Sequence, residues 1–417
     1  MSLRFIPLCV SSTLYANEMA VDLGRMAVKG LLNRTAFDPT KIDYLTYGTV
    51  IQEVATSNIA REVGLASGIP NSVPAHTVTM ACISSNQAIT TGAEAILAGR
   101  AKAVVAGGVE TMSDVPIRFS KPMRKRLLAA SKAKSPMQAL SCFKGFKLGE
   151  LAPQAPAIAE FSTGEVMGHS ADRLAATFGI SREASDDFAY RSHTLAQKAH
   201  DEGLLKGEIV PVNGNTTDNG IKSNPREKYS TLKPAFIKPH GTVTAANASF
   251  LTDGASASLI MDEDAAIAAG YTPLAVLHAW DYVSQDPKDE MLLGPAYGAY
   301  KLLNRAGLTL KDIDVFEMHE AFAGQVLANL AAMNSDTFAK DKIGAQGKLG
   351  EVPMEKLNNW GGSLSLGHPF GATGTRLVTT TANRLRAEDG QFGLLGACAA
   401  GGQGAVMLVE RWQPKKK

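Results

Sequence analysis

Short β-rich segments alternate with alanine-rich helical segments along this 417-residue chain, and the alternation occurs twice. In the first third, the pattern predicts a strand at 44–51, a helix from residue 57, a strand at 77–80, a helix at 85–98 and a strand at 103–106. In the last third, it predicts a strand at 313–318, a helix at 321–332, a glycine-rich turn at 361–371, a helix ending at residue 385, and strands at 393–397 and 405–409. Such alternation is typical of an α/β protein with a buried sheet, and its repetition predicts two similar halves.

The segment between the two halves has a different character. Residues 116–249 contain loops rich in proline and lysine and an amphipathic stretch at 171–203, so we interpret them as an insertion. A strand pattern with small residues returns after it. We therefore predict a first half made of residues 1–115 and 250–270, an inserted loop domain of residues 116–249, and a second half made of residues 271–417.

Composition excludes several classes of protein. The 42 Lys and Arg residues balance 40 Asp and Glu residues, so no net basic charge indicates a nucleic-acid partner. No uncharged apolar run reaches the roughly 18 residues that a membrane-spanning helix needs. The four cysteines are too scattered for a disulfide framework or for a zinc site with closely spaced pairs. We expect a protein of a reducing compartment without a metal site.

Two reactive side chains occupy equivalent positions in the two halves. Cys82 follows the predicted strand 77–80 and opens a helix, where the helix dipole is expected to lower the thiol pKa. His368 lies among glycines and precedes the last long helix, and imidazole is the side chain best suited to take a proton from a thiol near neutral pH. A buried structural cysteine and an ordinary loop histidine are the alternatives to a catalytic pair.

Two further candidates lie at the ends of predicted strands. Cys398 is in a turn of small residues, where a second thiol could transfer protons or simply pack. His319 and Glu320 begin a helix at a strand-to-helix corner, which is a common place for sites in α/β folds. The helix dipole explains the acidic residue there but not the histidine.

Four motifs together resemble those of the thiolase family in order and spacing, over nearly the whole chain. They are the segment around Cys82, HEAF at 319–322, GHPFGATG at 367–374 and CAAGGQG at 398–404. A closer match, to the branch that forms mitochondrial trifunctional β-oxidation complexes, is carried by TVTMACISSN at 77–86, VETMSDVPIR at 109–118, EVMGHSADRL at 165–174 and NNWGGSLSLGHP at 358–369. The resemblance implies the thiolase fold, in which two βαβαβαββ halves form five α-β-α-β-α layers and carry an inserted loop domain.

The resemblance also implies an activity, the thiolysis of a 3-ketoacyl-CoA by CoA to acetyl-CoA and an acyl-CoA two carbons shorter. Cys82 would carry the acyl group, His368 would take the thiol proton, and Cys398 would protonate the departing acetyl-CoA carbanion. His319, or a water that it holds, would donate to the enolate oxygen, and the backbone N–H groups of Cys82 and Ala400 would form a second oxyanion site. CoA is then a co-substrate, and we expect no permanently bound cofactor.

Binding contacts are implied in the insertion as well. Ser249 resembles the family serine near the CoA pantetheine, and Met167 lies in a stretch that lines the pocket. Between Asp114 and Glu150 there is no acidic residue, and this stretch carries a basic run. The basic run consists of Lys121, Arg124, Lys125, Arg126, Lys132 and Lys134.

The basic run could contact CoA phosphates, anionic lipid head groups or a partner subunit, or be an ordinary solvated surface. The resemblance favours a membrane surface and a hydratase/dehydrogenase α-subunit. It further implies a homodimer and a mitochondrial location, on the matrix side of the inner membrane.

The chain departs from the family pattern in three places. His319 replaces the asparagine of many thiolases, and Ala400 stands where many have glycine. Residues 4–7 resemble a segment that normally follows a strand, yet almost nothing precedes them, so we expect one sheet strand to be missing.

Three other functions are alternatives to this activity. A short-chain biosynthetic acetoacetyl-CoA thiolase would favour condensation. A non-catalytic scaffold subunit is disfavoured because both cysteines and His368 are retained. A β-ketoacyl synthase is disfavoured because it uses one cysteine with two histidines and no second catalytic cysteine.

Overall fold

The first half of the chain is built around a mixed six-stranded sheet, in a computed structural model that describes residues 2–156 and 159–414. Its elements are β1 (Ser2–Phe5), β2 (Cys9–Val10), α1 (Ala20–Thr35), β3 (Tyr44–Gly48), α2 (Ile59–Ala66), β4 (Ala75–Val78), α3 (Ser84–Leu97), β5 (Ala103–Glu110), β8 (Thr252–Met261) and α9 (Glu263–Ala268). The strands lie in the order β1–β8–β5–β3–β4, and β2 also pairs with β8. Strand β3 runs parallel to both β4 and β5, whereas β8 runs antiparallel to β5 and β1.

The second half contains a four-stranded sheet in the order β10–β11–β12–β9. Its elements are β9 (Ala275–Ser284), α10 (Gly294–Ala306), β10 (Val315–Met318), α11 (Ala323–Met333), α12 (Asp336–Phe338), α13 (Ser363–Leu366), α14 (Thr373–Ala387), β11 (Phe392–Ala399) and β12 (Gln403–Arg411). Strands β10 and β11 are parallel, and the other two pairs are antiparallel. Every predicted strand and helix of both repeats is present, with ends that differ by a few residues.

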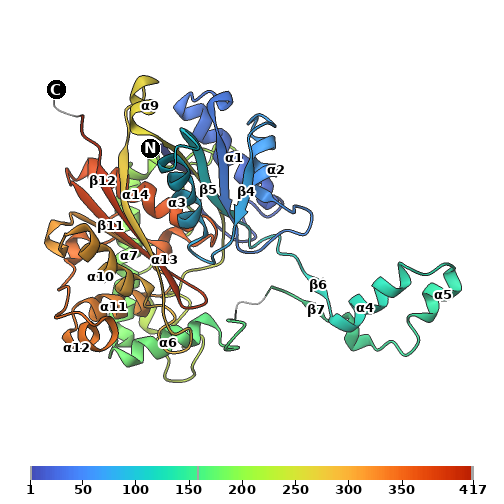
Figure 1. Cartoon of the computed structure of the whole chain (residues 1–417). Coiled ribbons are helices and arrows are strands. Elements are labelled where there is room, and N and C mark those ends of the chain that lie inside the picture. Colours follow the sequence, from blue (N-terminus) through green and yellow to red (C-terminus); the bar gives the residue numbers. More distant parts are fainter. Residues whose placement is uncertain (1, 157–158, 415–417) are drawn as a thin grey trace.

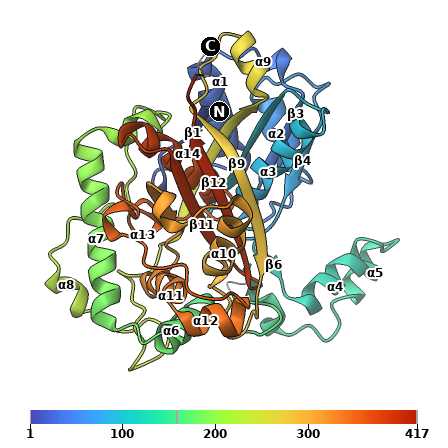
Figure 2. The same ribbon diagram turned by 60° about the vertical axis from the view of Figure 1, so that its left-hand side comes forward.

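The two halves stack as five layers. Helices α3 and α14 lie side by side between the two sheets (Figure 1), where α3 packs on β3 and β5 and α14 packs on β10, β11 and β12. Helices α1 and α2 cover the outer face of the first sheet, and α10 and α11 lie outside the second (Figure 2). The buried apolar faces of both sheets thus pack on the same central helix pair. Cys82 lies just before the N-terminus of α3, and His368 lies just before that of α14.

Strand β5 is longer than the sequence indicated because two glycines do not interrupt it. Gly107 and Gly108 continue the pairing with β8 up to Glu110. A Cβ atom on Gly108 would lie 1.9 Å from the carbonyl oxygen of Gly371, so only glycine lets the strand touch the loop of the other half. The two glycines therefore mark a close contact between the halves and not a turn.

The two repeats differ at their third strand. In the first half this is β4, whereas in the second half the corresponding segment makes only a single parallel bridge between Phe316 and Leu357. The next residue, Asn358, has a positive φ of 47° and uses its side-chain amide to accept from the Met318 N–H (2.8 Å) and to donate to the Met318 carbonyl (2.9 Å). One side chain thus satisfies the backbone groups that a longer strand would have paired.

The prediction of a missing first strand was wrong. Residues 2–5 form β1, which pairs antiparallel with residues 256–259 of β8. Four residues are enough because β8 already holds the register through its pairing with β5.

The inserted segment forms two structures. One is an arm of residues 118–154, which projects from the body of the molecule (Figure 1) and contains β6 (Arg118–Phe119), α4 (Lys121–Ala130), α5 (Pro136–Ser141) and β7 (Pro153–Gln154). The other contains α6 (Met167–Thr177), α7 (Arg182–Asp201) and α8 (Glu227–Ser230), of which α6 and α7 pack against α11. No helix within the described ranges is long and apolar enough to cross a membrane. The boundaries of the three parts remain a prediction.

Candidate active site

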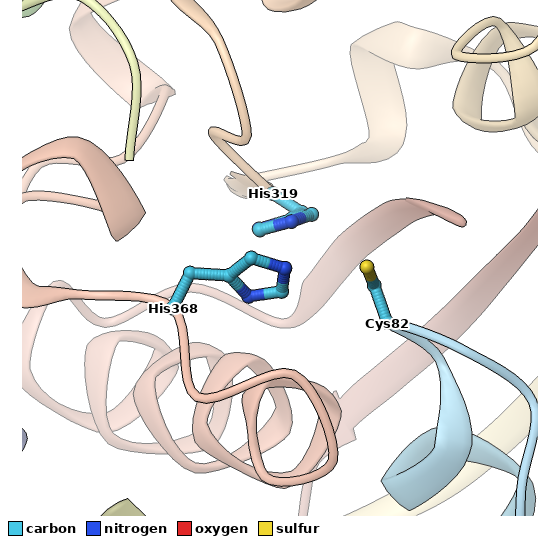
Figure 3. Close-up of side chains that lie close together, drawn as sticks. All are labelled: Cys82, His319 and His368. Atoms are coloured by element: carbon cyan, nitrogen blue, oxygen red, sulfur yellow. The ribbon is translucent and has the colours of Figure 1, made fainter. Parts of the chain in front are cut away.

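Cys82, His319 and His368 come together between the two halves, although they lie far apart in the sequence. The Cys82 sulfur and one ligand nitrogen from each ring lie within 4.8 Å of one another, and the His368 ring points toward the thiol (Figure 3). The two imidazole rings are 4.1 Å apart between centroids. Both histidines are buried and Cys82 is half-buried.

The chain reaches Cys82 through a tight turn between β4 and α3. Ala81, directly before it, has a left-handed φ of 45°, which is uncommon for a residue with a side chain. Helix α3 begins at Ser84, two residues later. The turn therefore presents the thiol at the helix entrance, as the sequence predicted, toward the loop that carries His368.

The prediction of a lowered Cys82 pKa was wrong. Burial raises the pKa of this thiol to about 12, and the nearby Glu110 carboxylate adds to the rise, whereas hydrogen bonds from the N–H groups of Ala400 and of Cys82 itself oppose it. The helix dipole is too weak to offset the loss of hydration. Cys82 is a neutral thiol at rest and needs a base in order to react.

His368 has the properties of that base. Burial, with the positive charge of Arg376, lowers the pKa of His368 to about 3, so the ring is neutral. Its Nδ1 lies 2.7 Å from the hydroxyl oxygen of Thr373, and this hydroxyl donates its only proton to the carbonyl oxygen of Pro369 (3.0 Å). The hydroxyl must therefore accept from Nδ1–H, which leaves the lone pair of Nε2 free to take the thiol proton.

His319 lies beside this pair as a second neutral imidazole. Burial, together with the neighbouring His368 and Arg376, lowers its pKa well below the usual value. Its Nδ1 lies 3.0 Å from the hydroxyl oxygen of Ser363, which also accepts from a terminal nitrogen of Arg376 (3.0 Å). When the serine donates to Nδ1, Nε2–H becomes a donor aimed into the site, and this Nε2 has no partner in the part of the chain that the structure describes.

The second thiol and the second donor pair lie at the end of β11. Cys398 is buried, and burial together with the nearby Cys82 raises its pKa, so it too is a neutral thiol. The N–H of Ala400 reaches the Cys82 sulfur, so this backbone donor lies beside the nucleophile, and its role in an oxyanion site stays a prediction. Gly401 and Gly402 follow with positive φ values of 82° and 67°, and they turn the chain back into β12.

Glu320, the carboxylate next to His319, is a structural residue. It is fully buried and accepts hydrogen bonds from the Ser192 hydroxyl (2.7 Å), the Asn358 amide (2.7 Å) and the Leu364 N–H (3.1 Å). A Cβ atom on Gly362 would lie 2.1 Å from its carboxyl carbon, so the glycine loop closes directly around this group. Glu320 therefore fixes the loop that precedes His368.

Ser249 and Met167 lie in different parts of the inserted segment. The Ser249 N–H donates to the Ala321 carbonyl (2.9 Å), and its flanking residues bridge Phe322 and His368, so this segment lies between the HEAF and GHP motifs. Met167 is the first residue of α6 and packs, half-buried, against the core of the second half.

The basic run lies on the arm, away from the cluster (Figure 1). Arg126 is held within the arm, because it pairs with Glu150 (2.6 Å) and donates to three backbone carbonyls, so it is less available to a partner than predicted. Lys121, Lys125, Lys132 and Lys134 are exposed.

Sequence reasoning missed the residues that hold the two histidines, namely Ser363, Thr373 and Arg376. Arg376 follows a run of glycine, alanine and threonine and precedes Leu377 and Val378, which is an unusual place for a charge and was the available clue. It also missed Glu110, which accepts from the N–H groups of Val50 and Gly371, each at 3.0 Å.

Comparison with known proteins agrees with this arrangement of residues. Residues 4–264 match the family model "Thiolase, N-terminal domain", and residues 271–411 match "Thiolase, C-terminal domain". The chain belongs to the thiolase family of acyltransferases.

Its relatives include the mitochondrial trifunctional enzyme subunit beta of Bos taurus, 60% identical over 97% of this chain and 86% of the relative, and the human protein of the same name, at 59%. A probable 3-ketoacyl-CoA thiolase of Caenorhabditis elegans is 56% identical over 97% of this chain and 92% of its own length. Human mitochondrial 3-ketoacyl-CoA thiolase has a similar structure, with a TM-score of 0.83 at 30% identity over 99% of this chain and 98% of the other, and it has also been solved in complex with CoA. The predicted family, fold and enzyme class are confirmed.

Proposed function

We propose that this chain is a 3-ketoacyl-CoA thiolase of fatty acid β-oxidation, which uses CoA to cleave its substrate through an acyl thioester on Cys82. The observation that carries this proposal is the neutral His368, whose Nε2 is left free beside a neutral thiol. The name of the nematode relative, a probable 3-ketoacyl-CoA thiolase, supports the same reaction.

In the first half-reaction, His368 takes the Cys82 proton and the sulfur attacks the 3-keto carbon of the substrate. The bond between C2 and C3 breaks, the acyl group stays on Cys82, and the Cys398 thiol protonates the acetyl-CoA carbanion. Two pairs of donors stabilise the negative oxygens: Nε2–H of His319 with protonated His368, and the N–H groups of Cys82 and Ala400. Cleavage is thereby divided into two steps with lower barriers.

In the second half-reaction, the Cys398 thiolate removes the proton of an incoming CoA thiol. The CoA sulfur attacks the acyl thioester, and Cys82 leaves as a thiolate that recovers its proton from His368. Every proton is returned, so the cycle needs no permanent cofactor and consumes only CoA as co-substrate. The human relative solved with CoA supports this choice of co-substrate.

We infer the binding roles of two further residues from their surroundings. Ser249 contacts the CoA pantetheine, because its segment runs between the HEAF and GHP motifs. Met167 lines the acyl pocket at the start of α6.

The assembly follows the trifunctional branch in this proposal. The relatives are named as beta subunits, which supports a hydratase/dehydrogenase α-subunit as partner. Strand β4 lies at the outer end of the strand order and directly precedes Cys82, so its unpaired side supports a homodimer formed through this edge.

The arm is proposed as the membrane contact, on the matrix side of the inner mitochondrial membrane. Apolar side chains are exposed on it next to the basic run, among them Leu128 at 63%, Met137 at 76% and Leu148 at 80%. Basic and apolar side chains on one projecting element suit the surface of an anionic bilayer. The mitochondrial names of the relatives support this location.

The proposal is tested by CoA-dependent thiolysis of 3-ketohexadecanoyl-CoA and of acetoacetyl-CoA, with intact-mass detection of acyl adducts. A preference for the long chain and an adduct that disappears in Cys82→Ser are expected. Turnover of the short chain alone would favour the acetyl-CoA acetyltransferase class, to which a Bacillus anthracis protein with a TM-score of 0.83 belongs. If the wild-type chain forms no acyl adduct at all, the result would favour the alternative of a non-catalytic scaffold subunit.

A further inference from the structure

The Cys82 cluster offers one sulfur and two imidazole nitrogens within 4.8 Å of one another. Thiolate and imidazole are the ligands that Zn²⁺ prefers in proteins, and a site with three protein ligands keeps a fourth position open. We propose that Cys82, His319 and His368 bind one zinc ion in the enzyme without substrate, and that the bound ion reversibly blocks the nucleophile.

Both rings are already oriented as ligands. Their Nδ1 atoms are occupied, by Thr373 in the case of His368 and by Ser363 in the case of His319, so the Nε2 atoms remain for an ion. Hydrogen bonds to the far nitrogen of each imidazole are a regular feature of metal sites, because they fix the ring orientation. For His319 to bind, the Ser363 oxygen accepts from Nδ1–H as well as from Arg376, which its two lone pairs allow.

A second observation points to a ligand. Nε2 of His319 is buried and has no hydrogen-bond partner among the described residues. Buried polar atoms are nearly always satisfied, so one that is aimed into a cluster of possible ligands marks a place where something binds. Substrate oxygen satisfies it during catalysis, and a metal ion satisfies it in the absence of substrate.

The spacing requires little adjustment. Zinc bonds of about 2.3 Å to sulfur and about 2.0–2.1 Å to nitrogen place tetrahedral ligand atoms about 3.3–3.6 Å apart. The present separations of up to 4.8 Å close by roughly 1 Å through side-chain rotation. Because Cys82 is only half-buried, a water can occupy the fourth position from the solvent side.

Charges around the cluster moderate the affinity. Arg376 lies behind Ser363 and opposes a cation, whereas Glu110 acts on Cys82 from the other side and favours one. Binding forms a bond from zinc to sulfur and breaks the S–H bond, so one proton leaves to solvent for each ion bound. We therefore expect affinity to increase with pH, and expect it to be lower than that of a structural zinc site.

The inhibitory consequence rests on the proposed function, but the binding itself does not. Zinc would occupy the sulfur that attacks the substrate and the nitrogen that acts as its base. An acyl group on Cys82 would exclude the ion in turn, so substrate and zinc compete for one thiol.

Binding is tested by titrating the metal-free full chain with Zn²⁺ against a chromophoric chelator. We expect one ion per chain in the wild type and in the matched control Cys142→Ser, which lacks the half-exposed thiol of the arm. Binding should be lost in Cys82→Ala and weakened more than about tenfold in His319→Asn. Unchanged binding in Cys82→Ala, or loss in Cys142→Ser, would overturn the site.

Two further measurements test whether Cys82 is a metal ligand and whether the bound ion inhibits the enzyme. Titration with Co²⁺ should give a thiolate-to-cobalt absorption band in the wild type, and the band should be absent after alkylation of Cys82 even if the variants fold poorly. Thiolysis by the wild type should fall at least about tenfold at saturating zinc and recover with excess chelator. Zinc bound at Cys82 without loss of turnover would overturn the inhibitory role, whereas normal zinc binding by a chain that never cleaves 3-ketoacyl-CoA would overturn the proposed function alone.

Discussion

The polar groups of the site between the halves and those of the arm of residues 118–154 differ in burial and in charge. In the site, both histidines and both thiols are neutral, only Cys82 is as much as half-exposed, and neighbouring hydroxyls fix the orientation of each ring. On the arm, the lysines of the basic run are exposed next to exposed apolar side chains. Reactivity therefore depends on desolvation and fixed geometry, whereas docking depends on charge that stays accessible.

This contrast predicts two independent readouts, thiolysis of a soluble substrate and binding to anionic vesicles. Variants of the site should change thiolysis and leave vesicle binding unchanged. Variants of the arm should change vesicle binding and leave thiolysis unchanged.

The largest effect is expected for Cys82→Ser. The hydroxyl is a far weaker nucleophile beside the same base, so turnover should fall roughly 10⁴- to 10⁶-fold while vesicle binding stays unchanged. Steady-state thiolysis measures the loss, and Cys142→Ser on the arm is the matched control with normal turnover. Normal activity in Cys82→Ser would remove the proposed mechanism.

Loss of the base should come next. His368→Gln is expected to lower kcat about 10²- to 10⁴-fold, since nothing else accepts the Cys82 proton. Intact-mass kinetics of acylation measure this step. Acylation at the wild-type rate would show that another group is the base.

The pH profile distinguishes the neutral base from an ordinary histidine. Because the pKa of His368 is lowered to about 3, the ring remains neutral as pH falls, and kcat/KM should not lose activity from this group between about pH 8 and pH 5. Burial raises the pKa of Glu110 to about 7, so a titration seen in that window belongs to this carboxyl and should vanish in Glu110→Gln. If kcat/KM of this variant still falls as the pH drops through about 6.5, His368 is charged at rest.

A structural substitution should have a smaller effect on turnover and a clear one on stability. Asn358→Ala leaves the buried N–H and C=O of Met318 and one Glu320 oxygen without a partner, which should lower the free energy of unfolding by about 3 kcal/mol. Urea denaturation measures it. Asn304→Ala, on the exposed surface of α10, is the control and should stay within about 0.5 kcal/mol.

The smallest effect is expected on the arm. Lys125→Gln removes one exposed charge and should weaken binding to anionic vesicles roughly fivefold, since each lysine near such a surface contributes about 1 kcal/mol. Lys311→Gln, an exposed lysine of the second half, is the control. Equal loss in both variants, or slower thiolysis in Lys125→Gln, would mean that the arm is not a separate docking element.

Much of the fold could be predicted because the repeat consists of strand and helix segments that can each be recognised from their own residues. The alternation of strands and helices predicts both sheets, and the small-residue helices after Cys82 and His368 predict the two central helices. The ends of elements were less accurate. The strand predicted at 103–106 ends at Glu110, because Gly107 and Gly108 continue β5 where the opposite loop approaches within contact distance of the Gly108 backbone.

Part of the site was also accessible from the sequence, since residue type and motif order indicated Cys82, His319, His368 and Cys398. Their protonation states were not. A helix N-terminus suggested a thiolate at Cys82, yet burial from both halves raises the pKa of that thiol to about 12. Desolvation depends on everything that surrounds a group, and most of what surrounds Cys82 lies hundreds of residues away in the chain.

The sequence by itself determined the family, the duplicated α/β plan and the chemical types of the reacting side chains, because periodicity and motifs are local properties of the chain. Only the tertiary structure decided that two neutral imidazoles and a thiol meet within 4.8 Å, and that Thr373 and Ser363 orient the rings. It also decided that Asn358 replaces a strand of the second half. These features depend on distances between segments that the chain brings together only when the two sheets close around α3 and α14.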